Sequence, residues 1–311
     1  MNNRVLAIGN YDPWDISAME ADFDLIHLGS SAQIGELDAQ TRAGITASAF
    51  KFGSFGPDEM DLLPDLAMIS NYGVGYDSID IAAARERGIR VTNTPDVLND
   101  DVADLTIGMM LMLTRRMRDG EAHVRSGAWA DGPLPLNRKF SGGRAGILGL
   151  GRIGRAIAER LVPFGMEIHY HARSEKDTPG WTYHDDPVSL AGAVDHLVIA
   201  LVGGPATEKY VSAEVIAALG AEGALYNISR GTTVDEDALL DALEAGRLMG
   251  AGLDVYLGEP RPNPRFLALG NVVLQPHQAS GTVQTRKAMG QLQRDNIAAH
   301  FAREDLLTPV A

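Results

Sequence analysis

The stretch Gly149-Leu150-Gly151-Arg152-Ile153-Gly154 follows a short apolar run, Ala145–Leu148, and opens a helix-like segment, Ile153–Leu161. A strand, a G-x-G-x-x-G turn and a helix in this order are typical of a pyrophosphate site. The first glycine allows the tight turn, the second lets the backbone approach the phosphates, and the third lets the helix pack on its strand. The amide groups at the helix start, at Arg152 and Ile153, then face an anion. Because the chain has 34 glycines, the motif is weak evidence alone and its surroundings must decide.

The composition is that of a globular protein with an acidic balance. Of the 311 residues, 45% are hydrophobic and 22% charged, and 27 basic against 41 acidic residues give a net charge of −14. This charge argues against nucleic acid or an anionic membrane as a partner. The lack of cysteine excludes disulfides and thiolate metal sites, and no H-x-x-H pattern indicates a metal. Without a signal-peptide pattern, the expected compartment is the cytoplasm.

Short apolar runs alternate with helical patterns along the chain, which predicts an α/β fold with parallel strands. The first series of expected strands is Val5–Ile8, Leu25–Leu28, Thr46–Phe50, Ala67–Ser70 and Ile89–Thr92. Helical patterns lie at Asp58–Leu63 and Ile79–Arg87. This part of the chain predicts a small doubly wound domain.

A second alternating series follows Asn93-Thr94-Pro95 and begins with one long helix, Asp100–Arg118, whose methionines are expected in the core. Its six expected strands are Ala145–Leu148, Glu167–Tyr170, Leu197–Leu201, Ala224–Ile228, Ala251–Val255 and Val272–Leu274. Expected helices among the connections are Ile153–Leu161, Ala213–Leu219 and Asp235–Ala245. A last helix, Thr282–Arg303, is expected to return to the first domain. The predicted domains are therefore residues 1–95 plus 283–311 and residues 96–282.

The residues after the second strand of this series bear on the choice of cofactor. An NAD site places an acid about 20 residues past the glycines, to bind the ribose hydroxyls. Here Ala172 stands near that position, followed by Arg173 and Ser174. A guanidinium fork and a hydroxyl suit a 2′-phosphate, whereas an exposed Arg-Ser after a strand is often only a solvated turn. In the context of the glycine turn, the sequence favours NADP(H), with NAD(H) as the alternative.

Three residues with ionisable side chains each follow a strand of the second series. Arg230 follows Ala224–Ile228, Glu259 follows Ala251–Val255, and His277 follows Val272–Leu274. Ligands of such sheets bind at the carboxyl ends of the strands, so these residues are candidates for one site. Singly, each has a simpler explanation as a helix-terminal charge, a surface acid or a packed histidine.

With these motifs the chain resembles the D-isomer-specific 2-hydroxyacid dehydrogenase family over nearly its whole length, most closely the glyoxylate/hydroxypyruvate/hydroxyphenylpyruvate reductase branch. The residues that carry the resemblance are Tyr72-Gly73-Val74-Gly75-Tyr76-Asp77, Val91-Thr92-Asn93-Thr94-Pro95-Asp96-Val97-Leu98, the glycine turn and the three strand-end motifs. The resemblance implies two doubly wound parallel-sheet domains, Rossmann-like and flavodoxin-like, with an active-site cleft between them. It also implies a homodimer formed through the dinucleotide-binding domain.

The implied reaction is the NADPH-dependent reduction of a small 2-oxo acid, such as glyoxylate or hydroxypyruvate, to the D-2-hydroxy acid. His277 would supply the proton, because imidazole titrates near neutrality. Glu259 would orient the ring and favour imidazolium, and Arg230 would polarise the carbonyl and anchor the carboxylate. The last two positions of the turn Tyr72-Gly73-Val74-Gly75 resemble the family's backbone clamp for that carboxylate.

Other positions follow from the same resemblance. Asp254 corresponds to the acceptor of the nicotinamide carboxamide, and Ile228 lies where backbone lines the nicotinamide. The loop Phe50–Pro57 is expected to face the substrate side chain, so Lys51 or Phe52 would set the substrate specificity. Lys51 would favour a substrate with a polar or anionic tail, and Phe52 a substrate with an aromatic or small tail. Trp129 lies in the expected dimer contact, either reaching the partner's pocket or packing at the interface.

Two alternatives stay open. Formate- or phosphite-oxidising dehydrogenases share this fold, although Glu259 weighs against formate enzymes, which carry glutamine there. A nucleotide-binding redox sensor or corepressor is the alternative from another class of protein. The intact set of Arg230, Glu259 and His277 makes that class unnecessary.

Overall fold

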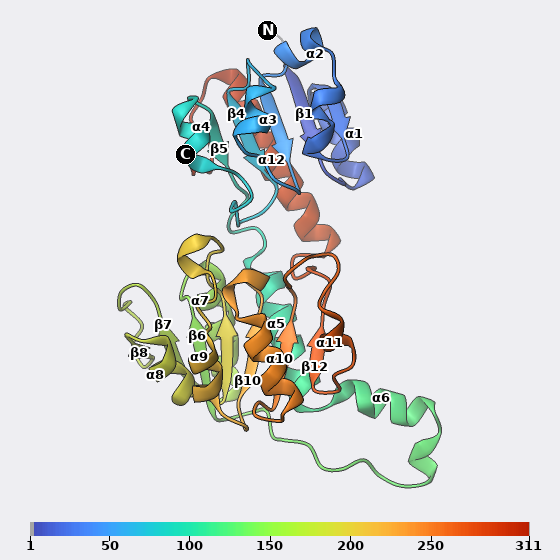
Figure 1. The fold of residues 1–311 in the computed structure, drawn as a ribbon, viewed down its shortest axis with the longest axis vertical. Coiled ribbons are helices and arrows are strands. Elements are labelled where there is room, and N and C mark those ends of the chain that lie inside the picture. The colour runs from blue at the N-terminus through green and yellow to red at the C-terminus, as the bar shows by residue number, and fades with distance from the viewer. Residues whose placement is uncertain (1–2, 311) are drawn as a thin grey trace. The chain divides into compact units, whose positions relative to one another are not determined.

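Two sheets of parallel strands form the two units of the protein, as the computed structural model of residues 3–310 shows (Figure 1). Of the described residues, unit 1 comprises 3–98 and 281–310, and unit 2 comprises Asn99–Ser280. Residues 1, 2 and 311, which belong to the predicted first domain, lie outside the described residues. The predicted fold class, two doubly wound α/β domains, is confirmed.

The sheet of unit 1 has five strands in the order β2-β1-β3-β4-β5. These are β1 (Arg4–Ile8), β2 (Asp24–Leu28), β3 (Ala47–Phe50), β4 (Met68–Asn71) and β5 (Arg90–Thr92). The helices are α1 (Pro13–Asp22), α2 (Ala39–Ala43), α3 (Pro57–Asp61), α4 (Ile81–Glu86) and α12 (Val283–Ala302). The order reverses between β1 and β3, as in flavodoxin-like sheets, and ligands of such sheets bind at this point.

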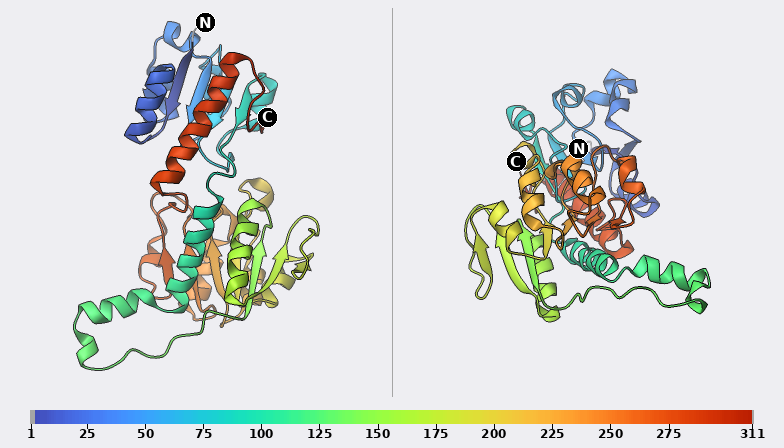
Figure 2. Two further views of the ribbon diagram at one scale, coloured as in Figure 1. Left: turned by 180° about the vertical axis from the view of Figure 1, so that it is seen from behind. Right: turned by 60° about the horizontal axis from the view of Figure 1, so that its bottom comes forward.

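The C-terminal helix α12 is an integral part of unit 1 (Figure 2). The side-chain amide of Gln293 is buried and donates to the carbonyl oxygens of Ser70, at 2.7 Å, and Phe50, at 3.4 Å. Beyond the helix, the N–H of Val310 donates to the carbonyl of Val91 at 2.9 Å. Residues distant in the sequence therefore fix the carboxyl ends of β3 and β4.

The sheet of unit 2 has seven strands in the order β12-β11-β10-β9-β6-β7-β8. These are β6 (Arg144–Leu148), β7 (Glu167–His171), β8 (Thr182–His184), β9 (His196–Ile199), β10 (Ala224–Asn227), β11 (Gly250–Leu253) and β12 (Val272–Leu274). The helices are α5 (Asn99–Thr114), α6 (Met117–Arg125), α7 (Arg152–Leu161), α8 (Pro187–Gly192), α9 (Ala213–Leu219), α10 (Glu236–Glu244) and α11 (Pro264–Leu267). This is the classic dinucleotide-binding order with one added strand, and it reverses between β6 and β9.

The predicted secondary structure differs from the observed one at several places, as the following examples show. The long helix predicted over Asp100–Arg118 ends at Thr114, because Arg116 adopts a left-handed conformation with φ of 45° and α6 then runs away from α5. The edge strand β8 was not predicted, since its three residues, all at least partly exposed, contain no apolar run. Helix α1 was also missed, although Pro13 at its first position is a helix-start signal.

Both units bury apolar side chains on the two faces of their sheets. Met109 and Met110 of α5 are fully buried and Met112 packs beside them, which confirms their predicted place in the core. No helix within residues 3–310 is both long and apolar enough to cross a bilayer.

Buried His196 on β9 makes the stability of the protein depend on pH. Burial, with a smaller effect from the charge of Arg138, lowers the pKa of His196 from 6.5 to about 4. Between these values the unfolded chain binds more protons, so the free energy of unfolding falls as the pH drops from 6.5 toward 4. We expect a loss of about 3 kcal/mol over this range.

Urea unfolding at several pH values in this range measures the loss. A His196→Gln variant keeps a polar group near Tyr226 but cannot take up the proton. Its free energy of unfolding should therefore change less steeply with pH than that of the wild type. The matched variant His123→Gln, on the exposed helix α6, should keep the wild-type slope. Equal slopes for wild type and His196→Gln would contradict the assignment.

Candidate functional site

The glycine turn lies at the carboxyl end of β6, where the strand order of unit 2 reverses. Gly149 has φ of 101°, and a Cβ there would lie 2.6 Å from the carbonyl oxygen of Ala200. A Cβ on Gly154 would lie 2.2 Å from the carbonyl oxygen of Gly149. At Gly151, by contrast, a Cβ would meet nothing within 4 Å. The outer two glycines are therefore required by the fold, whereas Gly151 leaves open space beside the start of α7.

Helix α7 begins with Arg152 and Ile153, directly after Gly151. Ile153 packs against the core, and Arg152 is exposed. A helix of 10 residues presents the N–H groups of its first turn, and its dipole favours an anion there. The turn and the helix start thus form a surface suited to a phosphate group.

Two cations and a hydroxyl lie on the loop after β7. Arg173 and Ser174 are exposed, and Lys176 places Nζ 3.4 Å from Ser174 Oγ. The loop is held by Tyr170, whose hydroxyl donates to the carbonyl of Lys176 and accepts its N–H at 2.8 Å. Sequence reasoning selected Arg173 and Ser174 but missed Lys176. The sequence feature that could have identified Lys176 is its position as a second basic residue shortly after the Arg-Ser pair.

Arg230 lies on a turn that is fixed by hydrogen bonds from side chains to backbone carbonyls. Its carbonyl accepts Asn227 Nδ2 at 2.9 Å, and Ser229 Oγ donates to the carbonyl of Leu201. A Cβ on Gly231 would lie only 2.0 Å from the carbonyl carbon of Tyr256. Sequence reasoning missed Gly231, which brings the Arg230 turn against the segment that leads to Glu259.

Glu259 and His277 form a hydrogen-bonded pair. His277 Nδ1 lies 2.7 Å from Glu259 Oε2, and the N–H of Tyr256 donates to Glu259 Oε1 at 2.9 Å. Burial raises the pKa of a carboxyl group, but here the His277 hydrogen bond and charge, with the Arg230 charge, outweigh burial and lower the pKa of Glu259. Glu259 is therefore ionised at neutral pH. Because Nδ1 of His277 binds this carboxylate, the other ring nitrogen, Nε2, points away from it.

The loop that carries His277 is attached to buried Asp254. The N–H groups of Gln278 and Ala279 donate to the two carboxylate oxygens at 2.8 and 2.9 Å, and the N–H of His277 donates to the Asp254 carbonyl at 2.8 Å. His277 has φ of 51°, a left-handed conformation that costs a residue with a side chain about 1 to 3 kcal/mol. These three bonds offset that strain and set the position of the imidazole.

Tyr256 connects the loops that follow β11 and β12. Its hydroxyl lies 3.0 Å from the carbonyl of Leu253 and 2.9 Å from that of Gln275, and it accepts the N–H of Gln275. Burial raises the pKa of Tyr256 to about 12, so the hydroxyl stays neutral. The loops bearing Glu259 and His277 are thereby held together.

In unit 1 the side chains of two asparagines hold three successive carbonyls of the loop after β4. The Asn71 amide donates to the carbonyls of Gly73 and Gly75 at 3.1 and 2.9 Å, and Asn93 Nδ2 donates to that of Val74 at 2.9 Å. The carbonyl of Gly73 also accepts the N–H of Thr94. In a planar trans peptide the N–H points opposite to the carbonyl, so the N–H groups of Val74 and Gly75 point away from these partners.

The remaining predicted positions are placed as follows. Ile228 is partly buried directly after β10, and its N–H donates to the carbonyl of Ile199 at 3.4 Å. Phe52 is 63% exposed and Trp129 is 66% exposed. Lys51 instead has a side chain that is only 12% exposed.

Comparison with known proteins agrees with this geometry. Residues 107–279 match the model of the D-isomer specific 2-hydroxyacid dehydrogenase, NAD binding domain. A hydroxyphenylpyruvate reductase from Plectranthus scutellarioides is 50% identical over 251 residues, 81% of this chain and 80% of that protein. A glyoxylate/hydroxypyruvate reductase from Arabidopsis thaliana is 45% identical over 294 residues, 94% of each chain. The crystal structure of an NADPH-dependent glyoxylate/hydroxypyruvate reductase from Sinorhizobium meliloti, with NADP and malonate, has a TM-score of 0.95 at 41% identity, covering 100% of this chain and 97% of that one.

The fold and the site define a two-domain α/β dehydrogenase that uses a nicotinamide dinucleotide. The chain belongs to the D-isomer specific 2-hydroxyacid dehydrogenase family. The family, the enzyme class and the cofactor class predicted from the sequence are confirmed. Its substrates are accordingly 2-oxo or 2-hydroxy acids.

Proposed function

We propose that the protein reduces glyoxylate, hydroxypyruvate or a similar small 2-oxo acid to the D-2-hydroxy acid with NADPH. The observation that carries the proposal is the ionised Glu259 bound to His277 Nδ1, with the Arg230 charge acting on the same carboxylate. This arrangement supplies a proton donor and a cation for a carbonyl that gains negative charge.

Two groups of donors bind the substrate carboxylate in this proposal. The outward N–H groups of Val74 and Gly75 bind it by the backbone, and Arg230 binds it with paired guanidinium donors while polarising the carbonyl. Residues 1–95 with 283–311 then serve as the substrate-binding domain, and residues 96–282 as the dinucleotide-binding domain.

His277 donates the proton to the carbonyl oxygen from Nε2. Glu259 remains ionised, holds the ring through Nδ1 and stabilises the imidazolium before transfer. Because Asp254 anchors the backbone on both sides of His277, the ring does not have to be ordered when the substrate binds.

The residues of unit 2 fit the dinucleotide. The open space at Gly151 and the amides of Arg152 and Ile153 suit the pyrophosphate, and the loop Arg173–Lys176 suits a 2′-phosphate. Ile228 would line the nicotinamide. Asp254 would accept its carboxamide, each carboxylate oxygen having a further lone pair beside the N–H that it already accepts. When bound, the reduced nicotinamide supplies the hydride for the carbonyl carbon.

We further propose a cytoplasmic homodimer formed through unit 2. The segment from α6 to β6 extends from the sheet of that unit in both figures of the fold and exposes apolar side chains. These are Met117, Val124, Trp129 and Leu136. Exposed apolar groups clustered on one extended segment are typical of a subunit contact.

NADPH oxidation with glyoxylate and with hydroxypyruvate, followed at steady state, tests the proposed activity directly. Turnover with either acid is the expected result. Failure to oxidise NADPH with every small 2-oxo acid tried would refute the proposed function.

The cofactor preference depends on the loop after β7. We expect Arg173→Gln to raise KM for NADPH about 10-fold to 100-fold, the loss expected for a hydrogen bond to a charged group, and to change KM for NADH little. Lys176→Gln should act in the same direction. The control Arg247→Gln removes the same charge from an exposed site of unit 2 and should leave both KM values unchanged. Equal effects on NADPH and NADH would show that this loop does not bind a 2′-phosphate.

A further inference from the structure

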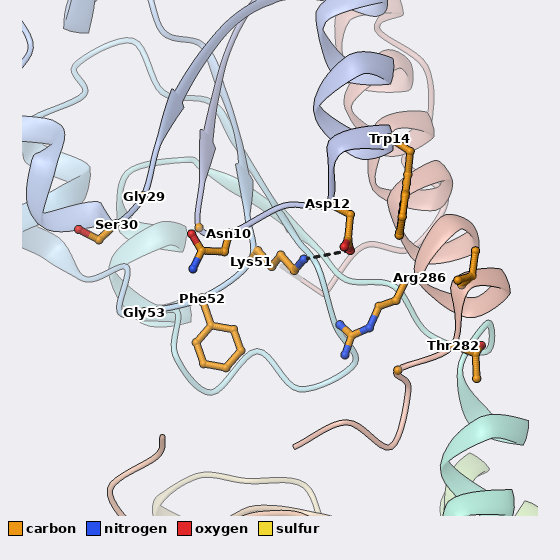
Figure 3. A pocket seen from close by; sticks show the side chains of 13 residues that line it. Asn10, Asp12, Trp14, Gly29, Ser30, Lys51, Phe52, Gly53, Thr282 and Arg286 are labelled. Carbon is orange, nitrogen blue, oxygen red and sulfur yellow. Dashed lines mark ion pairs between the residues drawn. The ribbon is translucent and has the colours of Figure 1, made fainter. Parts of the chain in front are cut away.

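A hollow of about 720 Å³ lies in unit 1 at the carboxyl ends of β1, β2 and β3 (Figure 3). Its charged lining is Asp12, Lys51 and Arg286, and its aromatic lining includes Trp14 and Phe52. The hollow coincides with the reversal of strand order between β1 and β3, the usual binding place of a doubly wound sheet. Lys51 and Phe52, on the loop expected to face the substrate side chain, line it, whereas the residues proposed for the carboxylate, the proton and the dinucleotide do not.

Two lining residues of the hollow, Lys51 and Arg286, lie close to Tyr72, which precedes the loop whose N–H groups are proposed to hold the substrate carboxylate. Strand β3, which precedes Lys51, pairs with β4, which leads through Tyr72 to Val74 and Gly75. Lys51 Nζ lies 4.8 Å from the centre of the Tyr72 ring, and the Arg286 guanidinium lies 6.0 Å from it. The Tyr72 hydroxyl donates to the Arg286 carbonyl at 2.8 Å, which fixes the tyrosine between them.

Lys51 lies close to an acidic side chain and an aromatic ring. The Lys51 side chain is 12% exposed, and its Nζ lies 3.8 Å from Asp12 Oδ2 and 5.2 Å from the Tyr11 ring centre. Figure 3 shows the amino group of Lys51 turned toward Asp12, and the Arg286 side chain reaching from α12 toward the same space. The wall therefore offers hydrogen-bond donors and an acceptor side by side.

Resting on the proposed function, we propose that this hollow binds the tail of a polyhydroxylated 2-oxo acid. With the carboxylate on Val74 and Gly75, carbon atoms beyond the carbonyl extend toward Lys51 and Arg286. A hydroxyl both donates and accepts, so it can pair with Asp12 as well as with the two cations. The aromatic faces of Trp14 and Phe52 take the C–H groups of the same tail.

Other tails match this lining less well. A phenyl ring would cover Lys51, Asp12 and Arg286 and deprive these charged groups of water without giving hydrogen bonds. A second carboxylate would pair with the cations but would be repelled by Asp12. The mixed lining thus selects a neutral tail with several hydroxyls.

The test compares kcat/KM for 2-ketogluconate, glyoxylate, 4-hydroxyphenylpyruvate and 2-oxoglutarate with NADPH. For the wild type we expect 2-ketogluconate to have the highest value. Arg286→Met should lower the ratio of kcat/KM for 2-ketogluconate to that for glyoxylate about 10-fold to 100-fold, as for a lost hydrogen bond to a charged group. Lys51→Met should lower it in the same way, and Arg85→Met, which removes a charge from the exposed side of α4 in unit 1, should not.

The outcomes separate the two proposals. If glyoxylate is reduced and any of the other three acids has a higher kcat/KM than 2-ketogluconate, the assigned tail is wrong while the proposed function stands. An unchanged ratio in Arg286→Met, with an unchanged thermal unfolding midpoint, would also overturn the assignment. If no acid is reduced, the proposed function itself fails.

Discussion

Replacing His277 with glutamine is expected to lower kcat/KM for 2-oxo acid reduction about 10²-fold to 10⁴-fold, the contribution of a positioned proton donor. The affinity for NADPH should change little, because the imidazole serves the substrate oxygen in the proposed mechanism. Steady-state kinetics gives the first quantity, and titration of NADPH fluorescence gives the second.

Two further variants make this test specific. His123→Gln alters a histidine of α6 whose Nε2 lies 2.8 Å from the carbonyl oxygen of Gly132, and it should keep the wild-type rate. Glu259→Gln removes the charge that favours imidazolium, so the alkaline limb of the pH profile of kcat/KM should move to lower pH. A His277→Gln enzyme with full rate would remove the proposed proton donor.

Arg230→Met is expected to lower kcat/KM about 10²-fold to 10³-fold, since a preorganised donor to the developing oxyanion is lost. Arg230→Lys keeps the charge but not the planar fork, so it should recover only part of this loss. The turn itself should persist in both variants, because Asn227 binds the backbone carbonyl of Arg230.

The measurement is the same kinetic assay, accompanied by thermal unfolding to verify the fold. Arg247→Met provides a variant of equal charge outside the site. If Arg230→Met raised KM alone and left kcat intact, Arg230 would bind the carboxylate but would not polarise the carbonyl.

The sequence predicted those features that depend on local geometry. Gly154 is required by a contact with Gly149 inside one strand-turn-helix unit, and the glycine spacing together with the flanking apolar run and helical pattern indicated the turn. Arg230, Glu259 and His277 could be grouped because parallel strands end at one edge of a sheet. The pairing of Glu259 with His277 at 2.7 Å agrees with the orientation expected for the ring.

What the sequence did not reveal depends on contacts between distant segments. The side-chain amides of Asn71 and Asn93 orient the loop Gly73–Gly75, and neither belongs to a motif of its own. The left-handed backbone of His277 becomes tolerable only through bonds to Asp254. Lys176 lies beside Ser174 because the Tyr170 hydroxyl holds the loop, a contact that the basic residue in the sequence does not reveal.

The return of α12 to unit 1 has a consequence for how the protein is made. Unit 2 is one continuous segment, Asn99–Ser280, so a ribosome releases all of it before residues 281–310 emerge. Domains fold as units during synthesis, and unit 2 can therefore fold while the sheet of unit 1 still lacks the Gln293 bonds to Phe50 and Ser70. A nascent chain stopped before Gly281 would hold a dinucleotide surface but no finished surface for an acid.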